Sequence, residues 1–72
     1  MKQKQLNRIQ NIMNGITRAR QELSGDRPVE LAMDVIRENF YAEEDSLMTS
    51  ERAAYLACMF LAWKDAGCPP LE

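Results

Sequence analysis

The sequence predicts an all-α protein, a small three-helix domain, and three observations support this fold class. Apolar residues recur at spacings of three and four along residues 4–24 and 28–43, which is the spacing of one face of an α-helix. Residues 53–63 form an unbroken apolar run between a helix-capping pair, Thr49 and Ser50, and a helix-ending Gly67. No stretch alternates apolar and polar residues as a half-buried strand does. We therefore expect residues 1–72 to form a single helical domain.

The first expected helix covers residues 4–24. Its apolar residues fit a heptad pattern, in which two helices pack along a shared line of side chains; they are Leu6, Ile9, Met13, Ile16 and Leu23. Arg20 occupies the remaining position of this pattern. Gly15 lies in the middle of the helix, where glycine costs about 1 kcal/mol relative to alanine. We expect Gly15 to allow another helix to approach closely, with a local bend as the alternative.

The second expected helix covers residues 28–43. The segment Ser24–Pro28 separates it from the first, because Gly25 suits the position just past a helix end and Pro28 suits the first turn of the next helix. The apolar residues of the second helix form a stripe wide enough to contact two neighbours; they are Val29, Leu31, Ala32, Met33, Val35, Ile36 and Phe40.

The third expected helix covers residues 50–66. Thr49 or Ser50 can cap its first turn, and Gly67 followed by two prolines ends it. The run from Ala53 to Trp63 is apolar on every side, and such a helix has to be covered on every side. Two other helices of a short chain offer too little surface for this, so the run predicts a partner. Residues 71–72 resemble a cloning remnant and are set apart from the functional argument.

These patterns predict a helical homodimer and a larger protein partner. A chain of this size buries only about 60% of the surface that its unfolded form exposes, and small domains often find further burial in a second subunit. The expected function is that of a non-enzymatic regulator, inhibitor or adaptor. In size and helical profile the chain is similar to accessory proteins of phages and mobile elements, a similarity that no motif supports. The residues expected at the oligomer or partner interface are Leu6, Ile9, Met13, Ile16, Leu56, Met59, Phe60 and Trp63.

The net charge of −2 hides a strong asymmetry. Residues 1–21 contain five of the nine basic residues and no acid, whereas residues 22–72 contain all eleven acids, so the two segments carry +5 and −7. The basic segment can pack beside the acidic part of its own chain or of a second copy, and we favour this interpretation. The alternative is a nucleic-acid-binding accessory protein that uses the basic helix; its contacts are then Lys2, Lys4, Arg8 and Arg18.

No motif predicts a catalytic site, a metal or a cofactor. The chain lacks histidine, so Cys58 and Cys68 have neither the usual base for an activated thiol nor enough partners for a zinc site. The longest apolar run has eleven residues, against about 20 needed to cross a membrane. Two cysteines are too few for a secreted disulfide scaffold. We therefore expect a cytoplasmic protein with reduced cysteines.

Overall fold

The computed structural model describes residues 3–40 and 48–71, and within these ranges it contains three α-helices and no strand. Helix α1 covers Gln3–Leu23, α2 covers Pro28–Phe40 and α3 covers Ser50–Asp65. The predicted all-α, three-helix fold is thus confirmed for the described part of the chain. The sequence placed the helices at residues 4–24, 28–43 and 50–66; residues 41–43 of the second range lie outside the described residues.

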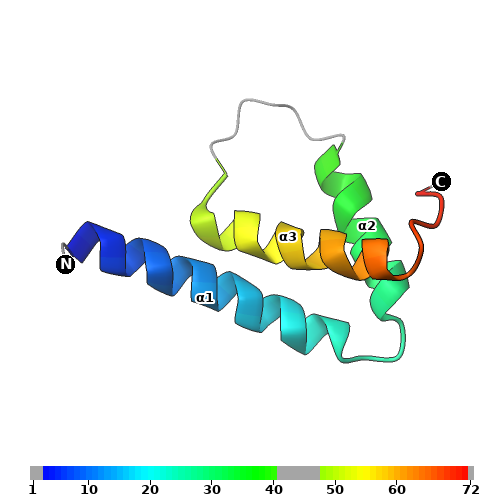
Figure 1. Ribbon diagram of the computed structural model, residues 1–72, viewed down its shortest axis with the longest axis horizontal. Helices are drawn as coiled ribbons and strands as arrows, with labels where there is room; N and C mark the ends of the chain where they lie inside the picture. Colours follow the sequence, from blue (N-terminus) through cyan, green and yellow to red (C-terminus); the bar gives the residue numbers. More distant parts are fainter. Residues whose placement is uncertain (1–2, 41–47, 72) are drawn as a thin grey trace.

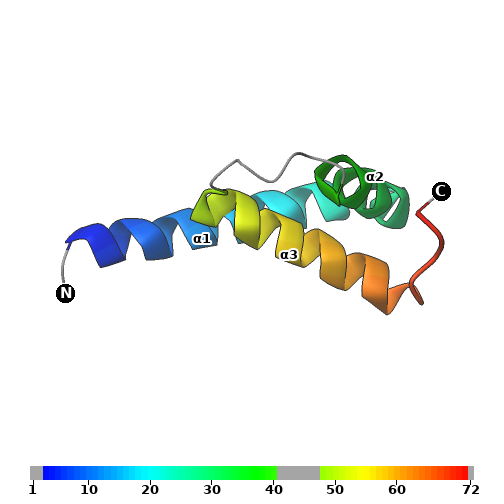
Figure 2. The same ribbon diagram turned by 90° about the horizontal axis from the view of Figure 1, so that it is seen from above.

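Helices α1 and α3 lie side by side and run in the same direction, and α2 crosses the C-terminal half of α3 (Figures 1 and 2). Helix α3 is therefore the central element: it packs against both other helices, whereas α1 and α2 touch each other much less. The N-terminal half of α1 extends well beyond the first turn of α3 (Figure 1). The chain is flat, with principal extents of 42 × 29 × 16 Å.

The core is small and lies where the three helices meet. Its buried members are Ala19 of α1, Ala32 and Val35 of α2, and Tyr55 and Met59 of α3. Partly buried apolar side chains surround them; these are Leu23, Leu31, Ile36, Leu56, Cys58, Ala62 and Trp63. Three of the five buried residues are alanine or valine, which limits what the hydrophobic effect contributes to stability.

At Gly15 the backbone of α1 lies close to α3. A Cβ atom at this position would overlap the backbone oxygen of Glu51 and lie 3.0 Å from Ala54 Cβ. Ala19, one turn further along α1, is also fully buried. The expectation that Gly15 allows a close helix approach is confirmed, and the two buried residues of α1, Gly15 and Ala19, are both small.

Both ends of α3 follow local sequence rules. Thr49 has extended backbone angles and its side chain accepts a hydrogen bond from the Arg52 N–H at 3.2 Å, which makes it the N-cap. At the other end Gly67 adopts φ +90°, which favours glycine, and its N–H donates to the Lys64 carbonyl at 3.0 Å. The chain then folds back on the helix, because the Trp63 indole N–H donates to the Pro69 carbonyl at 2.8 Å.

Candidate interaction surface

A polar network around Tyr55 joins α1 to α3. Tyr55 is only 3% exposed, and its hydroxyl donates a hydrogen bond to the Glu22 carboxylate. Arg18 lies within 3.5 Å of the same carboxylate, and its guanidinium carbon lies 4.6 Å from the centre of the Tyr55 ring. Arg18 was predicted as a nucleic-acid contact in the alternative interpretation, and the structure engages it in contacts within the chain.

The network continues from α3 to α2 through Arg52. The Arg52 guanidinium carbon lies 5.4 Å from the ring centre, and Arg52 donates to the Asn39 side-chain oxygen at 3.0 Å. Asn39 in turn donates to the Val35 carbonyl at 2.7 Å. All three helices are therefore joined through polar side chains at the edge of the core. This network was not predicted from the sequence. Its only local signal is the spacing of four between Arg18 and Glu22.

Because Tyr55 is buried, the free energy of unfolding is expected to fall at alkaline pH. Burial raises its pKa to about 12, and the hydrogen bond and the negative charge of Glu22 act in the same direction. An unfolded tyrosine has a pKa of about 10. The stabilising contribution of Tyr55 is therefore complete below about pH 10 and is lost as the pH rises from there to about 12.

We expect Tyr55→Phe to lower the free energy of unfolding by about 1 kcal/mol at neutral pH, because Glu22 loses its hydrogen-bond donor. Between about pH 10 and 12 the natural chain should lose more stability than this variant does. Urea denaturation followed by circular dichroism at several pH values measures both effects. Free energies of unfolding that fall in parallel with rising pH in the two proteins would contradict the role given to Tyr55.

The apolar run of α3 divides into an inner and an outer side. Tyr55 and Met59 point into the core, whereas Phe60 is 50% exposed and Leu61 is 56% exposed. Ala53 and Ala57 are exposed as well. These four residues lie on one side of the helix at spacings of three, four and eight, and we call Ala53, Ala57, Phe60 and Leu61 the α3 outer face. The Trp63 ring borders this face, 5.4 Å from the Phe60 ring between centroids.

The predicted heptad positions of α1 also lie largely on the surface. Leu6, Ile9 and Met13 are between 45% and 56% exposed, and Ile16 is partly buried. Successive residues of a helix are rotated by about 100°, which places Ile9 and Ile16 about a quarter turn or more away from Gly15. We call Leu6, Ile9, Met13 and Ile16 the α1 stripe. It lies beside the contact with α3 rather than within it.

The remaining residues predicted at an interface belong to the interior or its border. Met59 is fully buried within the chain. Leu56 and Trp63 are partly buried and pack against the core. The structure thus brings Leu6, Ile9, Met13 and Phe60 to the surface and directs Met59 inwards.

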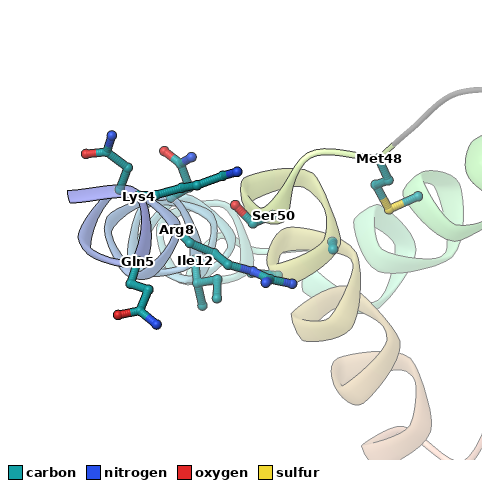
Figure 3. Close-up of a pocket in the computed structure, with 10 residues that line it drawn as sticks. Lys4, Gln5, Arg8, Ile12, Met48 and Ser50 are labelled. Carbon is teal, nitrogen blue, oxygen red and sulfur yellow. The ribbon is translucent and has the colours of Figure 1, made fainter. Parts of the chain in front are cut away.

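A hollow lies between the N-terminal half of α1 and the first turn of α3. Figure 3 shows Lys4 and Arg8 reaching from α1 towards the part of α3 that begins at Ser50. Asn7 and Asn11 line the same hollow. Within residues 3–40 and 48–71, no ion pair joins Lys4 or Arg8 to an acid, whereas Arg18 pairs with Glu22. Lys2, the fourth predicted nucleic-acid contact, lies outside the described residues.

The hollow has a basic and polar lining. Its described lining contains amines, amides, a serine hydroxyl and apolar groups, with no carboxylate and no thiol. A serine nucleophile needs a neighbouring base, and this lining offers neither a histidine nor a carboxylate for that role. In the described part of the chain, no three Cys, Asp or Glu residues come together as metal ligands would. Cys58 and Cys68 are both free thiols.

Comparison with protein-family models, with curated proteins and with solved structures finds no match to this chain. None of the helices in the described ranges has the length and apolar character that a membrane span requires. Three surfaces of the chain are candidates for binding: the α3 outer face, the α1 stripe and the basic hollow.

Proposed function

We propose that this protein is a small protein–protein interaction module that works as a homodimer and binds a larger protein as a regulator, inhibitor or adaptor. One observation carries the proposal: the central helix of the fold presents apolar side chains on the side that neither α1 nor α2 covers. Phe60 and Leu61 are both at least half exposed there. Aromatic and large apolar residues grouped in this way are typical of the centre of a binding surface.

The unburied apolar surface of α3 supports the same function. Full burial of a leucine or phenylalanine side chain contributes about 1.5–3 kcal/mol, so Phe60 and Leu61 leave a substantial part of this contribution unused in the free chain. Contiguous apolar patches of more than a few hundred Å² are rare on proteins that act alone. A partner that covers the α3 outer face buries Phe60 and Leu61. The free energy of this burial is what we propose drives binding.

We also propose that the protein is not an enzyme and that it is cytoplasmic. The first proposal is supported by the described lining of the hollow, which contains neither a histidine nor a carboxylate to act as a base for its serine. The second is supported by the free thiols of Cys58 and Cys68, which are typical of a reducing compartment.

The function is tested with Leu61→Glu, because a charge on the α3 outer face should block an apolar partner without disturbing the core. We expect immobilised natural chain to retain a specific host protein, and the Leu61→Glu chain to retain it at least about tenfold less. Gln21→Glu is the matched control, since Gln21 is exposed on α1 and the change adds the same charge. Circular dichroism should show equal helix content in all three proteins. Equal retention by Leu61→Glu and the natural chain would contradict the proposal.

Nucleic-acid binding remains the second candidate, because one observation favours it. Lys4 and Arg8 lie on the same side of α1, with Asn7 and Asn11 beside them, at the hollow shown in Figure 3. Basic and amide side chains together can contact phosphates and base edges. Salt-dependent retention of the natural chain on heparin, lost in the double variant Lys4→Gln with Arg8→Gln, would favour this candidate if Leu61→Glu had no effect on protein capture.

A further inference from the structure

The C-terminal tail of the chain, residues 68–71, is held against α2 and α3 by two side chains. The Trp63 indole N–H donates to the Pro69 carbonyl at 2.8 Å, and the Arg37 guanidinium donates to the Leu71 carbonyl. Trp63 belongs to α3 and Arg37 to α2, and the tail leads from the end of α3 to the side of α2 (Figures 1 and 2). We call Trp63 and Arg37 together the tail site.

The tail site contacts the backbone of the tail through hydrogen-bond donors alone. Indole and guanidinium groups donate and do not accept, and both bonds end on carbonyl oxygens. Proline has no N–H, so Pro69 and Pro70 offer backbone acceptors without donors. Any residue in place of Leu71 would present the same carbonyl to Arg37. The donors of the tail site and a proline-containing segment are therefore complementary.

The two prolines give the tail an extended shape. Proline fixes its own φ at about −65° and restricts the residue before it to extended conformations. Side chains of an extended segment point alternately to opposite sides, and Pro69 and Leu71 are partly buried whereas Pro70 is exposed. Extended proline-containing segments that dock beside aromatic side chains are a recurring form of peptide recognition. The tail occupies its site as such a peptide would.

The turn that leads into the tail is strained. Gly67 adopts φ +90° and Cys68 adopts φ +53°. Glycine tolerates a positive φ, whereas for a residue with a Cβ atom it lowers the population of the folded-back state by a factor of about 5–30. Cys68 also precedes a proline, which favours an extended backbone at its position. Release of the tail allows Cys68 to return to an extended φ, so the strain favours exchange of the tail for another peptide.

We propose that the tail site binds an extended proline-containing peptide of a protein partner, and that the chain's own tail occupies the site until this peptide displaces it. The inference rests on the proposed function in one respect, since the peptide belongs to the larger partner, and it adds a second contact and its chemistry. The attached tail competes at an effective concentration in the millimolar range. The tail therefore weakens binding of the peptide to its own chain.

The exchange is tested by fluorescence, because Trp63 is the single tryptophan of the chain. The probe is a synthetic peptide that copies residues 66–71 with serine in place of Cys68. The full chain with Pro69→Gly and Pro70→Gly has a more flexible tail, so acrylamide should quench its Trp63 more strongly than in the natural chain. The peptide should reverse this difference and bind the variant at least about tenfold more tightly than the natural chain. Equal quenching of the two chains, or no binding of the peptide to the variant, would overturn the proposal.

The location of the site is tested by adding Arg37→Gln to the double-glycine variant. This change removes a charged donor to the peptide backbone and should weaken peptide binding about tenfold. Arg20→Gln is the matched control, since Arg20 is exposed on α1 and the change removes the same charge. A peptide with alanine in place of both prolines should also bind more weakly, because it is less preorganised. Equal binding by the Arg37→Gln and Arg20→Gln chains would overturn the assignment.

The tail of a second copy is the competing occupant of the site. Natural dimers that dissociate when both prolines are replaced, without binding of the peptide, would place the tail in a second copy and overturn the proposal. Leu61→Glu should remove capture of the larger partner and leave binding of the synthetic peptide intact. Loss of capture in Leu61→Glu without any peptide binding would overturn the tail site alone, so failure of the two proposals is distinguishable.

Discussion

Gly15→Ala is expected to lower the free energy of unfolding by about 2 kcal/mol, the direction expected when a well-packed contact is overfilled. Helix propensity alone predicts the opposite, a gain of about 1 kcal/mol. The added Cβ would meet the backbone oxygen of Glu51 and the side chain of Ala54. Because a backbone atom blocks the space, α3 as a whole has to shift to accept the methyl group.

Gly25→Ala is the matched control for this prediction. At Gly25 a Cβ would meet only the Glu22 carbonyl oxygen, at the ordinary contact distance of 3.8 Å. Alanine at such a position reduces the freedom of the unfolded chain and leaves stability equal or slightly higher. Urea denaturation of the two variants beside the natural chain measures the difference. A Gly15→Ala protein as stable as the natural chain would show that α1 and α3 are not in close contact.

Met59→Ala is expected to lower the free energy of unfolding by about 2–5 kcal/mol. Met59 is the largest fully buried side chain of the described residues, at 0% exposure, and it lies in the centre of the core. A natural domain of 72 residues has a total stability of roughly 4–11 kcal/mol. The substitution therefore removes a large part of the total, and the midpoint of thermal unfolding is expected to fall clearly.

Leu61→Ala provides the comparison, since it shortens a side chain on the same helix two residues later. Leu61 is 56% exposed, so its truncation should cost below about 1 kcal/mol in the free chain. Thermal unfolding followed by circular dichroism separates the two variants. Equal destabilisation by both would mean that the outer face of α3 is covered in solution, in contradiction to the surface described above.

The helices were predictable because their signals are local. Apolar spacing, the Thr49 cap and the Gly67 end all lie within one or two turns of the feature that they determine, and the structure shows α3 ending as expected. The close approach at Gly15 was predictable for the same reason, since a glycine in mid-helix is costly unless a neighbour requires the space.

The contacting faces were harder to predict. In α1 the large apolar residues drew attention to the α1 stripe, whereas the residues that α1 buries are Gly15 and Ala19, whose small size gives little signal in a hydrophobic pattern. In α3 no polar residue between Ala53 and Trp63 marks the outer side, so periodicity could not separate buried Met59 from exposed Phe60. The Tyr55–Glu22 hydrogen bond joins residues 33 apart in the sequence, and no local rule reports such a pair.

The central position of α3 has a consequence for the order in which the chain folds. α1 and α2 touch each other little, and each packs mainly on α3, which is the last of the three helices in the sequence. Contact between Gly15 and Glu51 closes a long loop, and its entropic cost is repaid only when the core around Met59 forms. A growing chain on the ribosome therefore holds two helices without a stable core until α3 has emerged. Folding is expected to be a single cooperative step that follows synthesis of α3, rather than a helix-by-helix assembly.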